Sequence, residues 1–177
     1  MNHRLPLPIF LAVLLVTQAN CASSLPPLDS SMTLASGAEF DSSRAFQEIL
    51  LLETGTPAYE RARINYLLER VSKSPYNFIR NNGRYSGKRG AVHLKWKYYF
   101  RGGRSVKTAE EFIDRVATFS KRSGDPYLME FPTRKRYPLR DLLLRELREL
   151  DKELLVRRAQ RAQRADETAS STSTIPQ

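Results

Sequence analysis

The sequence predicts a single α+β domain that is mainly helical, contains a small antiparallel pair of strands and is flanked by disordered tails. In several segments, apolar residues recur three and four positions apart behind a capping residue, a pattern typical of amphipathic helices. Two short apolar segments, 78–80 and 127–131, predict strands, and the first is followed by the turn sequence Asn81-Asn82-Gly83. Once an N-terminal signal is removed, about 155 residues remain, which is the size of one domain.

Four or five helices are expected between the two ends of the chain, from five candidate helix starts. Four of them begin at hydroxyl residues, whose oxygens accept hydrogen bonds from the free amides of the first helical turn. The fifth begins near Pro138 and carries leucines at spacings of three and four. The capping residues are Ser43, Thr56, Ser86 and Thr108. The expected core consists of Ile64, Leu67, Leu68, Val71, Phe78, Ile79, Leu94, Phe112, Ile113, Val116, Leu128, Leu143, Leu147 and Leu150.

Two of these helices have distinctive first turns. Thr108 and Glu111 form a capping box, and the apolar residues behind it predict a helix that ends at Gly124. Gly87 and Gly90 lie in the first turn of the third helix, where glycine lowers helix propensity. From the sequence alone, these two glycines weaken that helix.

The N-terminus predicts export from the cytoplasm. Arg4 precedes a dozen uncharged and mostly apolar residues, and small residues follow at positions where a signal peptidase cuts. The apolar run is shorter than the roughly 20 residues that a transmembrane helix needs. The alternative is an uncleaved N-terminal anchor. We therefore expect an exported protein of the periplasm or cell envelope, with 1–20 as a signal peptide.

Cys21 is the single cysteine, so the chain forms no intramolecular disulfide. A lone cysteine after an apolar run and before a Ser/Pro-rich segment is typical of a lipoprotein, in which the thiol is acylated. The residues before Cys21 lack the usual leucine and small residue, and ordinary cleavage after Ala19 is the alternative. Both readings, a lipid anchor at Cys21 and an unmodified thiol, stay open at this point.

The rest of the chain divides by composition into three parts. Residues 21–55 are expected to be a flexible tether followed by a short helix, because residues 21–43 are rich in Ser, Pro and Ala and have no apolar period. Residues 56–156 form the α+β domain. Residues 157–177 are expected to be a basic extension of the last helix and a polar, disordered tail.

The chain is strongly basic, with 29 Lys and Arg against 19 Asp and Glu and a formal net charge of +10. Such a charge favours anionic partners. One segment, 80–107, contains no acidic residue and interleaves its cations with five aromatic residues. Cations attract phosphate groups, and aromatic side chains stack on bases or lie at a lipid interface. The candidate anion-binding residues are Arg80, Arg84, Lys88, Arg89, Lys95, Lys97, Arg101, Arg104 and Lys107.

For this basic segment the ordinary interpretation is a solvated face with the aromatic residues in the core. The functional interpretation is a surface for an anionic envelope component, namely phospholipid, lipopolysaccharide or a wall polymer. The alternative is that the protein is an interaction or structural module without anion specificity, and its partner would then be an acidic protein. Nucleic acid fits an envelope protein less well, and no small-molecule substrate is expected.

No catalytic site is visible in the sequence, so binding rather than catalysis is expected. His93 is the single histidine of the mature chain and is expected to be a packed, hydrogen-bonded residue. No metal site and no cofactor are expected, because no second histidine or cysteine stands at ligand spacing. Glu110, Glu111 and Asp114 lie at a helix start, where negative charge is favourable without catalysis. An enzyme with a site around His93 and this helix start is a third alternative.

Residues 60–149 contain an ordered series of short motifs: Ile64-Asn65-Tyr66-Leu67-Leu68, Phe78-Ile79-Arg80-Asn81, Tyr85, Ala91-Val92-His93-Leu94, Thr108-Ala109-Glu110-Glu111-Phe112-Ile113-Asp114 and Ser123-Gly124-Asp125-Pro126-Tyr127. Through this series the segment resembles the YfeK-like proteins, a family of small bacterial envelope proteins of unknown function. The resemblance implies an α+β fold and a secreted or lipid-anchored protein, and it implies no activity. The family often has a cysteine just before the first strand, where Tyr76-Asn77 stands here; the doubled Asn81-Asn82 and the basic last helix also depart from its pattern.

Overall fold

A computed structural model describes residues 32–34, 40–101 and 105–172. The described chain forms a single α+β domain with five helices and a four-stranded antiparallel sheet, which confirms the expected fold class. The helices are α1 (Arg44–Leu51), α2 (Pro57–Lys73), α3 (Gly87–Phe100), α4 (Ala109–Arg115) and α5 (Leu139–Thr172). The strands are β1 (Asn77–Arg80), β2 (Gly83–Ser86), β3 (Leu128–Glu130) and β4 (Arg136–Pro138).

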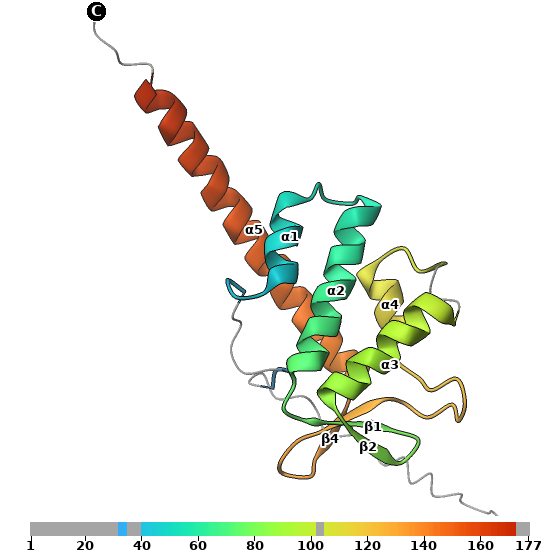
Figure 1. Cartoon of the computed structure of the whole chain (residues 1–177). Helices are drawn as coiled ribbons and strands as arrows, with labels where there is room; N and C mark the ends of the chain where they lie inside the picture. Colours follow the sequence, from blue (N-terminus) through green and yellow to red (C-terminus); the bar gives the residue numbers. More distant parts are fainter. Residues whose placement is uncertain (1–31, 35–39, 102–104, 173–177) are drawn as a thin grey trace, which may run out of the picture.

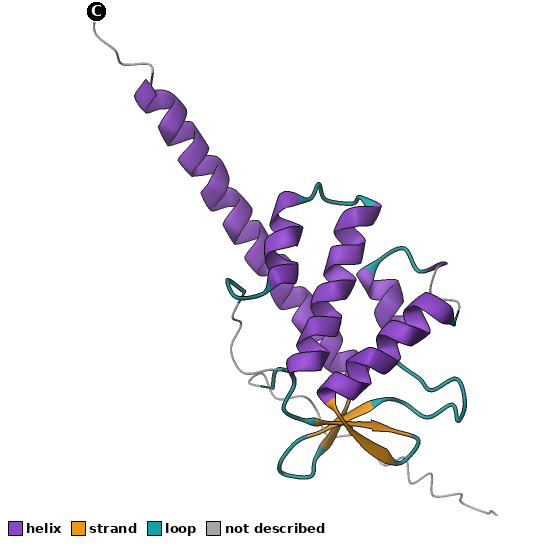
Figure 2. Ribbon diagram, in the orientation of Figure 1, coloured by secondary structure: helices purple, strands orange, loops and turns teal. Residues whose placement is uncertain are grey.

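The sheet has the order β2-β1-β3-β4 and lies at one end of the helical layer (Figures 1 and 2). The β1–β2 hairpin turns at Asn81 and Asn82, whose φ angles of 47° and 62° are those of a two-residue turn that requires positive φ at both positions. The expected pairing of β1 with the apolar segment after residue 127 is confirmed, with Phe78 opposite Met129. Strand β4, which the sequence did not predict, adds a fourth strand beside β3.

The helices begin where the sequence places them. Ser43, Thr56, Ser86 and Thr108 each accept a hydrogen bond from the backbone amide three residues later. The expected core is buried, except that Leu128 is half-buried. Local capping and apolar spacing therefore predicted these helix starts and the core correctly.

Helix α4 is shorter than expected, since it ends at Arg115 instead of continuing to Gly124. The Ile113 carbonyl accepts hydrogen bonds from the Ala117 amide at 3.2 Å and from the Thr118 hydroxyl at 2.7 Å. Phe119 instead pairs with Pro126 in an isolated bridge, and its side chain is 53% exposed. Residues 118–120 pair with residues 125–127 instead of continuing the helix, so residues 118–124 form a loop beside α3.

Part of the segment expected to be a tether packs on the domain. Leu34 is fully buried, and its backbone amide donates to the Glu146 carboxylate on α5 at 2.9 Å. Phe40 packs against Phe46 with ring centroids 4.9 Å apart. Residues 1–31 and 35–39, which include the expected signal segment, the cleavage region and Cys21, lie outside the described residues.

Helix α5 extends to Thr172, through residues 166–172 that the sequence placed in a disordered tail. Arg158 donates to the Leu52 carbonyl at 2.9 Å, so the start of the extension is tied to the end of α1. From residue 159 to residue 168 the side chains are exposed, and the helix projects away from the domain (Figure 1). Ala, Arg and Gln are strong helix formers, and a helix satisfies its own backbone without burial.

Gly87 and Gly90 occupy the closest approach of α3 to its neighbours. A Cβ at Gly90 would lie 2.6 Å from the buried ring of Phe78, and one at Gly87 would meet the backbone carbonyls of Val71 and Ser74. The sequence had suggested that these glycines weaken the helix. In the fold they are the residues that let α3 pack on α2 and β1.

We expect Gly90→Ala to destabilise the protein by about 1–3 kcal/mol in urea unfolding, because overpacking a closed contact costs about that much. The gain in helix propensity, about 1 kcal/mol, is too small to offset it. Lys88→Ala, on the exposed side of the same turn, is the matched control and should change stability by less than about 0.5 kcal/mol. An equally stable or more stable Gly90→Ala protein contradicts this account of the packing.

Candidate functional site: a basic pocket between α3 and the 118–124 loop

The cations of segment 80–107 do not share one face. Arg84 forms an ion pair with Glu130 at 2.9 Å. Lys88 and Lys95 line a groove that also contains glutamates, and Arg89 lies beside an apolar pocket. Lys107 lines another hollow near Thr108, and Arg104 lies outside the described residues. The fold therefore does not place the cations of segment 80–107 on one continuous basic face.

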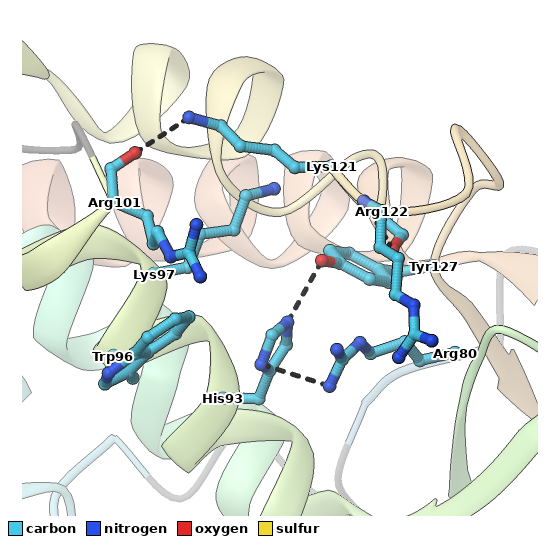
Figure 3. A pocket seen from close by; sticks show the side chains of 9 residues that line it. Arg80, His93, Trp96, Lys97, Arg101, Lys121, Arg122 and Tyr127 are labelled. Carbon is cyan, nitrogen blue, oxygen red and sulfur yellow. Dashed lines mark hydrogen bonds between the residues drawn. The ribbon is translucent and has the colours of Figure 1, made fainter.

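Three of the predicted residues do meet. Arg80 at the end of β1, Lys97 on α3 and Arg101 at the end of α3 line a pocket of about 420 Å³ (Figure 3). Lys121 and Arg122, from the loop after α4, complete it. The remaining lining residues are His93, Trp96, Ser120 and Tyr127.

Sequence reasoning missed Lys121 and Arg122. They lie in a turn-forming stretch, but no local pattern indicates that this turn lies beside α3. Their position depends on the early end of α4 and on the hydrogen bond from the Ser120 amide to the Asp125 carbonyl at 2.8 Å. Lys121 donates to the carbonyl of Arg101 at 2.8 Å, which joins the two sides of the pocket (Figure 3).

The five cations of this pocket, Arg80, Lys97, Arg101, Lys121 and Arg122, form no ion pair with any carboxylate of the described chain. Among the described residues, no acidic side chain lines the pocket. The Nε of Arg80 is buried and has no hydrogen-bond partner in the described part of the chain. We refer to these five cations with the four other lining residues as the basic pocket.

Lys97 supports the pocket from inside the fold. It is only 4% exposed, and its ammonium group donates to the carbonyls of Val116 and Phe119, each at 2.6 Å. These bonds hold the loop that carries Lys121. Burial, followed by the charges of Lys121 and Arg80, lowers the pKa of Lys97 to about 8.

His93 is half-buried and lies at the wall of the pocket, hydrogen-bonded as the sequence predicted. Arg80 donates to its Nδ1 at 3.4 Å, and Nε2 lies 3.1 Å from the hydroxyl of Tyr127 (Figure 3). Because a guanidinium only donates, Nδ1 is the acceptor, which places the proton of the neutral ring on Nε2. Burial, followed by the charges of Arg80 and Lys97, lowers the pKa of His93 to about 4.

This pKa predicts a pH dependence of stability. The folded state resists protonation of His93 until about pH 4, whereas the unfolded chain takes the proton near pH 6.5. Between these values the unfolded state binds more protons, so the free energy of unfolding falls as the pH falls. In urea unfolding at pH 7 and pH 5, His93→Gln should lose less stability on acidification than the parent protein.

The ring protons of His93 in the NMR spectrum provide a direct measurement. We expect their titration midpoint near pH 4, and the only other histidine, His3, lies in the expected signal segment and is absent from a mature protein. A midpoint at or above pH 6 contradicts an electropositive environment for this ring.

One acidic residue at the start of α4, Glu110, forms an ion pair with an arginine that the sequence analysis did not single out. Arg63 on α2 forms ion pairs with Glu60 at 3.0 Å, with Glu110 at 2.9 Å and with Asp151 at 2.8 Å. Burial alone would raise the pKa of Glu110, but a backbone hydrogen bond and Arg63 hold it below its ordinary value. A carboxylate held ionised in this way is suited to an ion-pair network and does not have the raised pKa of a general acid.

Two further properties bear on the kind of site. In the described ranges, no group of three or more His, Cys, Asp and Glu side chains is arranged to hold a metal ion. No helix formed by the described residues is both long enough and apolar enough to cross a membrane.

Comparison with known proteins places the pocket in a region that matches a family model. Residues 58–151, more than half of the chain, match the model described as a family of unknown function (DUF5329). The chain belongs to this family. Every residue of the basic pocket lies within the part that matches the DUF5329 model.

A curated relative supports the same assignment. The chain is similar to the uncharacterized protein YfeK of Salmonella typhimurium (strain LT2), with 38% identity over 71 residues. The matched region is 40% of this chain and spans 58% of the length of that relative. The resemblance to YfeK-like proteins is thereby confirmed, and no solved structure matches the chain.

Proposed function

We propose that this DUF5329 protein is an exported, non-enzymatic protein of the cell envelope that binds a phosphate-type anion of an envelope component in the basic pocket. The observation that carries the proposal is the set of five cations around one hollow, none of them paired with a described carboxylate. Elsewhere on the domain, arginines such as Arg63, Arg70 and Arg140 have carboxylate partners at 2.8–2.9 Å. The pocket therefore holds positive charge that the fold leaves uncompensated.

The electrostatics of the pocket favour an incoming anion. A concave surface lined by charges of one sign focuses the potential and raises the local concentration of counterions. Part of the lowering of the pKa values of His93 and Lys97 comes from neighbouring cations. A bound anion would offset that repulsion, so binding should raise both pKa values.

The donor groups fit an oxyanion. Arg80, Arg101 and Arg122 present guanidinium groups, which match the geometry of phosphate and carboxylate oxygens in paired hydrogen bonds. Lys121 adds a point charge at the exposed edge. A phosphate group offers several acceptor oxygens to these donors, and phospholipids, lipopolysaccharide and some wall polymers carry such groups.

The location in the envelope is supported by the sequence of residues 1–20 and is the part of the proposal that the fold does not address. Intact mass of the native protein tests it. A mature N-terminus between Asn20 and Ser24 is expected, with an added acyl mass on Cys21 if the chain is a lipoprotein. A native protein that still begins at Met1 contradicts export.

Binding is tested by titrating the mature protein with inorganic phosphate while following the fluorescence of Trp96, the only tryptophan, which lines the pocket. Phosphatidylglycerol vesicles should bind, and phosphatidylcholine vesicles should bind far more weakly. Affinity for the anionic vesicles should fall steeply between low and physiological salt, because exposed charges are screened over about 8–10 Å. If neither phosphate nor anionic vesicles bind, the proposal is wrong and an acidic protein partner takes its place.

A further inference from the structure

A second pocket adjoins the basic pocket and differs from it in character. It has a volume of about 360 Å³ and shares Arg80, His93 and Trp96 with the basic pocket. Its other side is formed by Phe78, Tyr85 and Val92, with Arg89 at the edge. We call it the apolar pocket.

The apolar pocket is bordered by large side chains that the fold leaves in contact with water. Val92 is 65% exposed, Trp96 is 44% exposed and Tyr85 is 37% exposed. Single exposed apolar residues are common, but a group of them around one hollow marks an interaction site. The described part of the chain thus leaves more than a third of each of these side chains exposed.

We infer that the two pockets form one site for a phosphorylated amphiphile, with its phosphate group in the basic pocket and its aliphatic chain in the apolar pocket. The inference rests on the proposed function and specifies its ligand. Because Arg80, His93 and Trp96 line both pockets, the pockets are contiguous and a single molecule can occupy both at once. The orientation of the bound ligand follows from the two linings. The cations of the basic pocket bind its phosphate group, and the apolar side chains of the other pocket contact its aliphatic chain.

An aliphatic chain fits the apolar pocket better than a nucleotide base. Arg101 lies over the ring of Trp96 at 5.0 Å, and His93 stacks near it with centroids 6.3 Å apart, so two groups already occupy the surroundings of this ring. A base also needs acceptors and donors along its edge. Apart from the hydroxyl of Tyr85 and the ring of His93, the polar side-chain groups in the described lining of the apolar pocket are two guanidiniums and the indole N–H of Trp96, which only donate.

The test is a series of monoalkyl phosphates measured by isothermal titration calorimetry on the mature chain, below their aggregation concentrations. Inorganic phosphate, butyl phosphate, hexyl phosphate and octyl phosphate carry the same head and increasing apolar surface. We expect the affinity to rise about threefold to fourfold for each methylene group that leaves water, until the pocket is filled. Inorganic phosphate sets the affinity of the basic pocket alone.

Two variants separate the pockets. Val92→Asn, at an exposed position that lines the apolar pocket and not the basic pocket, should reduce the ratio of hexyl phosphate affinity to inorganic phosphate affinity. Lys121→Gln, at an exposed position that lines the basic pocket only, should weaken both ligands and preserve their ratio. A structural disturbance common to both variants would not produce this opposite pattern.

The outcomes of these experiments distinguish phosphate binding in the basic pocket from recognition of an aliphatic chain in the apolar pocket. Absence of any binding by inorganic and alkyl phosphates contradicts the proposed function itself. Phosphate binding with an affinity that does not depend on chain length leaves that function standing and overturns the amphiphile. Adenosine monophosphate binding more tightly than octyl phosphate also overturns it, because the apolar pocket would then accept a base.

Discussion

Replacing Arg101, Lys121 and Arg122 together with glutamate is expected to weaken phosphate and anionic-vesicle binding by at least about 100-fold. Hydrogen bonds to charged groups contribute about 1.5–3 kcal/mol each. The three glutamates also make the electrostatic potential of the pocket less positive, which disfavours an anion. All three side chains are exposed and lack ion pairs on the described domain, so the fold should survive. The measurement is the Trp96 titration, with circular dichroism as the check on folding.

The matched control replaces Lys88, Lys95 and Lys107 with glutamate; these lysines lie in segment 80–107, as Arg101 does, but outside the basic pocket. Both triple variants change the net charge equally, so any effect of overall charge is the same in each. The control should reduce phosphate affinity only slightly. An equal loss in both variants would show that net charge, and not the pocket, determines binding.

The largest expected loss of stability is that of Glu146→Ala. Glu146 is 5% exposed, and its carboxylate accepts hydrogen bonds from Nε of Arg70 at 2.8 Å and from the amide of Leu34 at 2.9 Å. Removing one partner of a buried ion pair deletes the attraction between the two charges together with both of these hydrogen bonds, and such a change costs about 3–5 kcal/mol. Urea unfolding should show this loss.

Glu149→Ala is the control for that experiment, because Glu149 lies one turn away in an exposed ion pair with Lys152. Exposed pairs contribute about 0–1 kcal/mol, so this change should be nearly neutral. A loss of less than about 1 kcal/mol for Glu146→Ala would indicate that Arg70 finds water or another partner when the carboxylate is removed.

Much of the secondary structure follows from local chemistry. The four capping hydroxyls are observed in their expected role, because a cap depends only on residues within one turn. The turn at Asn81 and Asn82 was predictable for the same reason, since asparagine tolerates positive φ. Features set by competition between distant segments were not predictable, and the early end of α4 and the pairing of β4 are examples.

The candidate site was predictable in part. An acid-free basic segment correctly indicated uncompensated positive charge, and Arg80, Lys97 and Arg101 belong to the pocket that holds it. The same pattern did not separate them from Arg84, which is neutralised by a glutamate 46 positions away. Ion-pair partners at such separations depend on the register of β1 on β3, and no local pattern encodes it.

The sequence by itself determined the fold class, the helix starts and the positive charge of this protein, because each depends on composition or on neighbours within a few residues. Only the tertiary structure decided which cations share a pocket, since Lys121 and Arg122 reach α3 through the loop that Lys97 holds with two hydrogen bonds. The tertiary structure also determined the role of Gly87 and Gly90 in packing. Their cost to the helix is a local property, whereas the space that they leave for α2 and β1 exists only after packing.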